Sequence, residues 1–368
     1  MLPGCATRKG LEFEVVVSMI HSMNSRDRVY AALTRGPVDR IPVCGMGWTI
    51  GAVAGGFSTK EYAQDGNIMA KGQIAFWKKT GVDILNPTSD MGQLAEGWGV
   101  KMRYEADLTP MLDEFAVKEP SDWEKLRVLD PLVDGRMYVT IEAVKNIREH
   151  LGDKVALMPY VPSPLTSATH VCYMEQVMMD ILLNPDALHI GLKTMTETII
   201  AYIEAIMDAG ADGVLYATTR ASGEITTEEQ YREFGEKYDR LVLSSLKRQD
   251  GTNILHVCGV EPHFGILAGY TNANGINWWD RGSNLSLEEA KKKFGDKICL
   301  VGGIDQTTTL ILEGAEAVEQ EAKEAIEKGF ADGRGMILSP GCEISPNTPL
   351  ENVKMMVKAA ELYGKGGR

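Results

Sequence analysis

Cysteine is scarce in this sequence, with six residues in 368. That density is far below the density of small secreted domains held by disulfides, so we expect reduced cysteines and a cytoplasmic protein. Basic residues are in the minority, with 38 Lys and Arg against 51 Asp and Glu and a formal charge of -13. Because no dense basic run is present, the charge disfavours nucleic acids and anionic membranes as partners. Small substrates or protein partners are favoured.

Long hydrophobic runs are also missing. The apolar stretch at 15–20 is too short to cross a bilayer, and acidic side chains precede it where a signal peptide carries basic ones. We therefore predict neither export nor membrane insertion. Residues 1–22 are expected to form an irregular extension, because a helix with Asn24 or Ser25 as its N-cap begins directly after them.

The chain from 23 to 368 alternates short β-branched and apolar runs with longer segments of helical periodicity. This pattern is typical of strand–helix units and a mostly parallel sheet. Eight strands are predicted, at 41–46, 82–86, 155–160, 213–217, 253–257, 275–279, 298–302 and 336–339. Helices are predicted at 138–150, 194–209, 227–248, 286–294 and 315–328.

Eight strands joined by helices favour a single α/β domain, a (β/α)8 TIM barrel over 23–368, because no linker-like tract divides the chain. The alternative is an open, doubly wound sheet. Its Gly-x-Gly-x-x-Gly turn is missing after the first strand, where only Gly45 and Gly47 are present. The weakly periodic segment 91–134 is predicted to be an insertion of loops and short hairpins that can lie across one mouth of the barrel.

A His-x-Cys pair closes the fifth predicted strand. Strand alternation puts His256 and Cys258 on the same side, at the end where barrel enzymes keep their chemistry. Cys342 follows the eighth strand and belongs to the same mouth. One imidazole and two thiolates without a fourth protein ligand describe a catalytic zinc site with an open position. The spacing alone equally fits three ordinary residues, because lone cysteines are common in protein cores.

Four segments carry a resemblance to a known family. They are HVCG at 256–259, GDKICLVGGID at 295–305, SPGCEISPNTPLENV at 339–353 and the opening RDRVYAALTRGPVDRIPV at 26–43. The chain from 23 to 364 resembles the uroporphyrinogen decarboxylase superfamily, and within it the zinc-dependent, corrinoid-linked methyltransferases, which include methylcobamide:coenzyme M methyltransferases. The resemblance implies a TIM barrel in which His256, Cys258 and Cys342 bind zinc.

The loop after the first predicted strand argues against porphyrinogen decarboxylation. Decarboxylases of the superfamily carry an Arg-Gln-Ala-Gly-Arg loop after the first strand, which grips the carboxylates of the substrate. Here the same place reads GMGWTI at 45–50. This loop has no arginine to pair with carboxylates in bidentate fashion.

Two methyl-transfer reactions fit an open zinc site. Zinc can polarise the ether oxygen of a methoxylated aromatic compound while Co(I) takes the methyl group, or it can hold a thiol such as coenzyme M as the nucleophile toward a methyl-Co(III) corrinoid. The sequence favours the first reaction, O-demethylation, because aromatic residues follow several strands. A third interpretation is a non-catalytic component that only binds a corrinoid protein. In each case the corrinoid is carried by a partner protein, because this chain lacks the Asp-x-His-x-x-Gly pattern of corrinoid-binding domains.

Further candidates stand near strand ends. The predicted substrate-binding residues are Trp48, Asn86, Tyr160, Trp278 and Trp279. At most one residue of the Trp278–Trp279 pair can face the pocket, and core packing explains the pair equally well. Asp280 and Asp305 are predicted to handle protons or to bond to His256, with helix capping as the alternative. His170 and His263 are expected at the surface.

Overall fold

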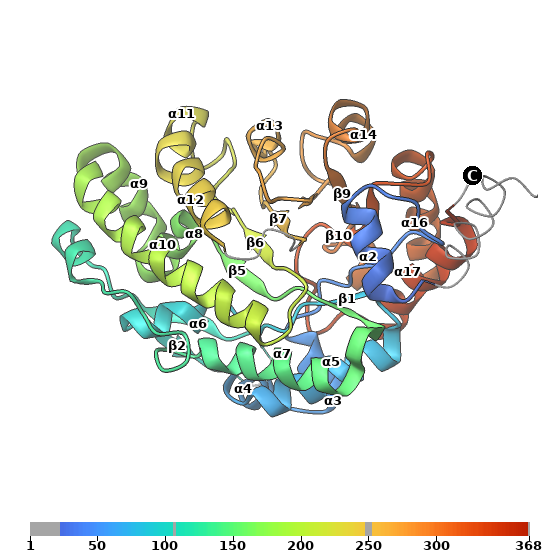
Figure 1. Cartoon of the computed structure of the whole chain (residues 1–368), viewed down its shortest axis with the longest axis horizontal. Helices are drawn as coiled ribbons and strands as arrows, with labels where there is room; N and C mark the ends of the chain where they lie inside the picture. Colours follow the sequence, from blue (N-terminus) through green and yellow to red (C-terminus); the bar gives the residue numbers. More distant parts are fainter. Residues whose placement is uncertain (1–22, 106–107, 247–251, 367–368) are drawn as a thin grey trace, which may run out of the picture.

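A computed structural model describes residues 23–105, 108–246 and 252–366 of the chain. The extension predicted at 1–22 lies outside the described residues, as does the end of the helix predicted at 227–248. Helices surround a central set of short strands (Figure 1).

In the described part of the chain, eight parallel segments form a closed ring: an irregular first segment around Val43 and Cys44, then seven positions made of regular strands, of which the third position of the ring contains both β4 and β5. The regular strands are β1 (Ile84–Leu85), β4 (Ala156–Leu157), β5 (Tyr160–Pro162), β6 (Leu215–Ala217), β7 (Ile254–His256), β8 (Gly275–Asn277), β9 (Cys299–Ile304) and β10 (Met336–Pro340). Strands β5 to β10 form one parallel sheet in chain order, and β1 pairs with β4. Single bridges from Val43 to Leu338 of β10 and from Cys44 to Ile84 of β1 close the ring. The predicted TIM barrel is confirmed.

Two predicted strands differ from the structure. The first, at 41–46, makes only the two isolated bridges, because Pro42 has no N–H to donate and Met46 turns the chain with a φ of 46°. The third, at 155–160, is split into β4 and β5. Pro159 stands in the gap and cannot donate to a neighbouring strand, which moves Tyr160 from a strand end to the start of β5.

Most of the ring of helices follows the predicted periodicity. The helices are α2 (Ser25–Leu33), α3 (Ile50–Gly55), α4 (Thr59–Gln64), α5 (Gly66–Thr80), α6 (Gly92–Ala95), α7 (Met137–Leu151), α8 (Pro164–Val171), α9 (Met174–Leu183), α10 (Pro185–Asp208), α11 (Glu228–Tyr231), α12 (Lys237–Ser245), α13 (Phe264–Leu267), α14 (Leu287–Phe294), α15 (Thr309–Leu312), α16 (Ala315–Gly329) and α17 (Leu350–Tyr363). The predicted cap of the first is confirmed, since Asn24 Oδ1 accepts from Asp27 N at 2.8 Å. The helix predicted at 227–248 contains a π-helical turn at Arg232–Glu236 between α11 and α12.

The segment 91–134 contains the short hairpin β2 (Lys101–Arg103) and β3 (Met111–Glu114), flanked by α6, by short 3-10 helices and by loops. Next to the hairpin, Thr109 shares a hydrogen bond of 2.8 Å with Thr49, which follows the first barrel segment. Residues of the 91–134 segment also line a hollow together with Ser345, Pro346 and Asn347, which follow Cys342. The insertion therefore contacts loops of the carboxyl mouth.

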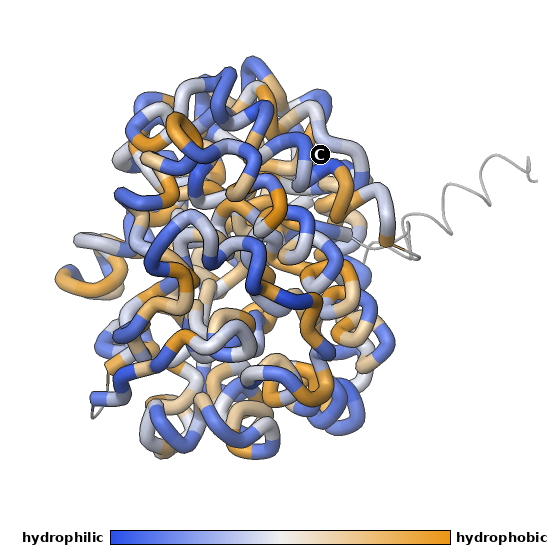
Figure 2. The backbone as a smooth tube through the Cα atoms, turned by 90° about the vertical axis from the view of Figure 1, so that its left-hand side faces the viewer, coloured by the Kyte–Doolittle hydropathy of each residue, from blue (hydrophilic) through white to orange (hydrophobic). Residues whose placement is uncertain are grey.

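The core lies within the barrel and between the barrel and its helices. Every residue of β9 and β10 is buried, as expected for parallel strands covered on both faces. Hydrophilic and hydrophobic stretches alternate along the helices (Figure 2), which fits helices with one covered face. Within the described ranges, no helix combines the length and the apolar character needed to cross a membrane.

Candidate metal centre

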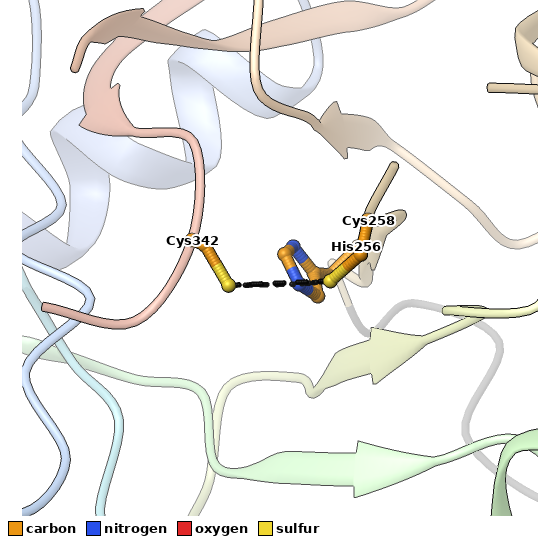
Figure 3. Close-up of side chains that lie close together, drawn as sticks. All are labelled: His256, Cys258 and Cys342. Carbon is orange, nitrogen blue, oxygen red and sulfur yellow. Dashed lines mark hydrogen bonds between the residues drawn. The ribbon is translucent and has the colours of Figure 1, made fainter. Parts of the chain in front are cut away.

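Three ligand-type side chains meet at the carboxyl mouth of the barrel. His256 ends β7, Cys258 follows it by two residues, and Cys342 arrives from the loop after β10 (Figure 3). His256 Nε2 lies 3.1 Å from Cys258 Sγ and 3.7 Å from Cys342 Sγ, and the two sulfurs are 4.0 Å apart. These spacings suit atoms that share one zinc ion at about 2.0–2.3 Å each. The imidazole is buried and both cysteines are partly exposed, and among the described residues no fourth His, Cys, Asp or Glu joins the cluster.

Asn277 on the neighbouring strand orients the imidazole. The register of β7 and β8 places it opposite His256, and its Oδ1 lies 2.7 Å from His256 Nδ1. The Asn277 amide is itself fixed, because Nδ2 donates to the carbonyl oxygens of Val301 and Pro340 at 3.0 and 2.9 Å. Oδ1 can then only accept, so His256 donates from Nδ1 and presents the Nε2 lone pair to the sulfurs. The donor set and its tautomer fit zinc.

The two thiols differ electrostatically. The contact with Cys342, aided by the charge of Arg220 and opposed by burial, lowers the pKa of Cys258. The same contact with Cys258, together with burial, raises the pKa of Cys342. Cys258 is therefore the first of the pair to ionise. A cation bound between the two sulfurs favours loss of the second proton, because metal ligands bind as thiolates.

Trp48 and Tyr160 form an aromatic wall. Their ring centroids lie 4.5 Å apart, and both side chains are almost fully buried. Burial, followed by the charge of Cys258, raises the pKa of Tyr160, so its hydroxyl stays protonated at neutral pH. Asn86 is different: it is buried in the barrel, where it contacts Cys44 Sγ and donates to the Met158 carbonyl oxygen at 2.7 Å. Its amide is occupied in joining three barrel segments.

The two tryptophans after β8 have different surroundings, and only Trp278 lies away from its predicted position, whereas the pocket role of Trp279 stays a prediction. Trp278 is fully buried, packs edge-on against Phe264 of α13 and donates to the Leu285 carbonyl oxygen, so it belongs to the core between barrel and helices. The expectation that it lines the pocket is wrong, because strand alternation turns Asn277 inward and Trp278 outward. Trp279 is partly buried, and its ring covers Gly282 while its backbone lies against Gly341.

Asp280 and Asp305 have other partners than the predicted His256. Asp280 accepts from the Gly303 amide at 2.8 Å, and burial raises its pKa. Asp305 accepts from the amides of Thr307 and Thr308 in a side-chain turn before α15, whose N-cap is Thr308, so the alternative of helix capping is not met either. The bond predicted from these carboxylates to His256 is made by Asn277 instead. Their role in proton handling stays a prediction.

The structure places several side chains near the candidate metal centre that the sequence did not predict there. Asn277 could have been found from its position opposite His256 in adjacent strands. Arg220 has no such signal, because it stands in an irregular loop after β6. His170, expected at the surface, is buried on α8, and burial lowers its pKa to about 3. Glu343 is held by Thr49 Oγ1 at 2.9 Å, and burial raises its pKa to about 8.

The chain is similar to known proteins over most of its length. A model of the uroporphyrinogen decarboxylase (URO-D) family matches residues 24–363. The methylcobamide:CoM methyltransferase MtaA of Methanosarcina barkeri is 29% identical over 92% of this chain and 98% of its own length. A uroporphyrinogen decarboxylase of Pseudoalteromonas atlantica is 26% identical over 93% of this chain and 98% of its own length. The solved structure of a methyltransferase from Methanosarcina mazei superposes with a TM-score of 0.83 and 28% identity, covering 93% of this chain and 99% of that one.

Proposed function

The chain belongs to the uroporphyrinogen decarboxylase family, and from this premise we propose that it is a zinc-dependent methyltransferase that moves a methyl group between a small thiol and the cobalt of a corrinoid carried by a separate protein. The observation that carries the proposal is the convergence of His256, Cys258 and Cys342 at the barrel mouth, where no fourth ligand-type side chain joins them among the described residues.

The donor set favours one of the two reactions that the sequence left open. Two thiolates neutralise the charge of Zn²⁺, which makes the ion a weak Lewis acid for an ether oxygen but a good partner for a soft third sulfur. Bound zinc would hold the substrate thiol as a thiolate at neutral pH. A methyl-corrinoid:thiol methyltransferase therefore suits the triad better than the O-demethylase favoured by the sequence.

Similarity to relatives supports the same choice. Two of the related proteins are named for methyl transfer between a methylcobamide and CoM, a thiol, and the similar solved structure is a methyltransferase. The case for a methoxylated aromatic substrate is reduced to Trp48 and Tyr160, because Trp278 lies in the core. Decarboxylases also align, but GMGWTI at 45–50 offers no arginine for a substrate carboxylate.

The protein's own residues have defined tasks in this proposal. Asn277 fixes the imidazole, so that Nε2 of His256 and the two sulfurs keep one geometry during turnover. The wall made by Trp48 and Tyr160 limits water at the mouth, which protects a bound thiolate from hydration. A corrinoid bound to a separate protein would supply the methyl group to a thiol held by His256, Cys258 and Cys342.

The test is metal content and methyl transfer in matched cysteine variants. Wild type, Cys258→Ser, Cys342→Ala and the control Cys299→Ala are purified anaerobically, and zinc is measured by elemental mass spectrometry. Cys299 is a buried cysteine of β9. We expect about one zinc per chain in wild type and control, and loss of zinc and methyl transfer in both ligand variants. Retained zinc or unchanged turnover in Cys342→Ala contradicts the proposal; retained corrinoid-protein binding without turnover separates an enzyme from a scaffold.

A further inference from the structure

Helix α9 is an additional element at the carboxyl mouth. One helix is enough to connect two consecutive barrel strands, but α8, α9 and α10 all lie between β5 and β6. Because α10 leads into β6, it runs from the carboxyl end of the barrel to the amino end, and its first residue, Pro185, lies at the carboxyl end. α9 ends at Leu183, two residues before Pro185, and packs against α8 and α10 (Figure 1). The additional helix therefore lies at the level of the mouth.

The inner face of α9 is anchored in the core. Val177 and Asp180 are fully buried. Trp123 Nε1 donates to Asp180 Oδ2 at 2.7 Å, and the side-chain amides of Gln176 and Asn184 donate to Asp180 Oδ1 at 2.8 and 3.0 Å. These bonds fix the rotation of the helix about its axis. The side chains on its outer face are therefore held in place by the fold.

The outer face of α9 is apolar. It is formed by two adjacent rows of side chains at four-residue spacing, which are Met174, Met178 and Leu182 in one row and Glu175, Met179 and Leu183 in the other. Leu182 and Leu183 are 64% and 65% exposed, and Met179 is 47% exposed. Single exposed apolar side chains are ordinary, whereas neighbouring ones that form a patch mark an interaction site. We refer to the five apolar residues of the two rows as the α9 surface.

The first turn of α9 is connected to the candidate metal centre through Arg220. Arg220 Nη1 lies 3.9 Å from Met174 Sδ, and Arg220 Nε donates to Thr169 Oγ1 of α8 at 3.0 Å. The charge of the same guanidinium acts on Cys258. A protein that covers the α9 surface would therefore be next to the mouth.

The size and charge of the α9 surface favour a transiently bound protein. A helix of ten residues is about 15 Å long, so its outer face is smaller than the roughly 800 Å² that each partner contributes to a standard stable interface. Two copies of a chain with a formal charge of -13 also repel each other. Helices that lie on anionic membranes carry Lys and Arg on their polar face, and α9 has neither. A different protein is thus a better occupant than a second copy or a membrane.

We propose that the α9 surface is a docking site for the corrinoid protein beside the mouth of the barrel. The inference rests on the proposed function, because methyl transfer to or from a corrinoid on a separate protein requires that protein to bind at the mouth and to leave again. Burial of the exposed leucines and methionines would stabilise the complex, and the small area would keep it short-lived.

The test compares two methyl donors, with coenzyme M as the thiol. Free methylcobalamin is a small donor that needs no protein contact, and the second donor is a methylated corrinoid protein that wild type demethylates. With either donor the methyl group passes from Co(III) to the thiolate sulfur, the thiol proton goes to solvent, and the Co(I) that remains is measured by its absorbance. The variants are Leu182→Ser/Leu183→Ser and the control Leu362→Ser.

Leu362 is a matched control. It is 62% exposed near the end of α17, and Gly364, two residues later, accepts from the Ile41 amide at the amino end of the barrel. Its replacement removes the same kind of exposed side chain far from the mouth. Zinc content and melting temperature are measured for both variants, so that a loss of metal or of fold is detected directly.

We expect Leu182→Ser/Leu183→Ser to raise the KM for the corrinoid protein by roughly 10- to 100-fold, the range for truncating two side chains in the centre of an interface. The kcat at saturating corrinoid protein and the rate with free methylcobalamin should stay within about twofold of wild type. The control should change neither donor's kinetics by more than about twofold. An equal loss with both donors, or an unchanged KM for the corrinoid protein, overturns the inference.

Two further outcomes separate this inference from the proposed function. If wild type demethylates neither donor, the methyltransferase function is wrong, and the partner assigned to the α9 surface is wrong with it. If wild type demethylates both donors but forms a dimer in light scattering that Leu182→Ser/Leu183→Ser dissociates, the function stands and the α9 surface belongs to a second copy of the chain.

Discussion

At the scale of single residues, the geometry of the candidate metal centre depends on a side chain outside the three ligand-type residues. Asn277 Oδ1 accepts a hydrogen bond from His256 Nδ1, and Asn277 Nδ2 donates hydrogen bonds to two carbonyl oxygens on neighbouring strands. A histidine whose second nitrogen is held presents a single tautomer and one ring orientation to a metal. The position opposite His256 in β8 thus determines how well the triad is prepared.

Replacing Asn277 tests this dependence. Asn277→Val should raise the dissociation constant for zinc by about 10- to 100-fold, because the imidazole loses its partner. Asn277→Asp should lose less, since an oxygen acceptor remains. Competition with a chromophoric zinc chelator measures both, with the exposed Asn284→Val as the control. Unchanged affinity in Asn277→Val would show that the strands alone position His256.

At the scale of secondary-structure elements, a buried carboxyl joins α12 to its surroundings. Asp239 accepts hydrogen bonds from Tyr216 of β6, Tyr231 of α11 and Tyr270 after α13, at 3.1, 2.6 and 3.0 Å. Burial outweighs these bonds and raises the pKa of Asp239 from 3.8 to about 6. The folded chain therefore binds this proton more tightly than the unfolded chain does.

The shift predicts a pH dependence of stability. The contribution of protonated Asp239 is complete below about pH 4 and is lost as the pH rises through about 6. Its size is about 2–3 kcal/mol. Asp239→Asn cannot titrate, so the difference in unfolding free energy between variant and wild type should shift in favour of the variant by that amount between pH 4 and 6.5. Urea unfolding at several pH values measures it, with Glu229→Gln as an exposed control. Parallel pH profiles for Asp239→Asn and wild type would contradict the assignment.

At the scale of the whole molecule, a network of ion pairs stabilises the end of the barrel opposite the candidate metal centre. Asp83 is fully buried just before β1 and accepts from Arg28, Arg40 and the Val43 amide at 2.7, 2.7 and 2.8 Å. It links α2, the first barrel segment and the second, where the ring has only isolated bridges. In TIM barrels this end serves stability, and the carboxyl end serves chemistry.

Removing Asp83 should separate stability from metal binding. Asp83→Ala leaves two arginines with low exposure without this partner and should lower the free energy of unfolding by about 3–5 kcal/mol. Zinc affinity of the folded protein should stay within about twofold, because the triad belongs to the other end. Denaturant unfolding and chelator competition measure the two quantities. The exposed Glu351→Ala, which breaks a surface pair with Lys354, should change stability by less than about 1 kcal/mol. A large loss of zinc affinity in Asp83→Ala would mean that the two ends are coupled.

Local sequence patterns predict the barrel and the shared position of three ligand-type side chains. Alternation of apolar runs and helical segments is set by local periodicity, and because His256 ends β7 while Cys258 and Cys342 shortly follow β7 and β10, their common mouth follows from parallel topology. The break in the third strand does not follow from its sequence, because a proline within a strand run allows either a bulge or an interruption.

Which polar groups act together at the mouth depends on three-dimensional packing. Asn277 and His256 are 21 residues apart and meet through strand register, which a single sequence does not specify. Whether Trp278 faces the pocket or the helices depends on where β8 ends. Local patterns fix which elements form, whereas the pairing of side chains from separate loops is a property of three-dimensional packing.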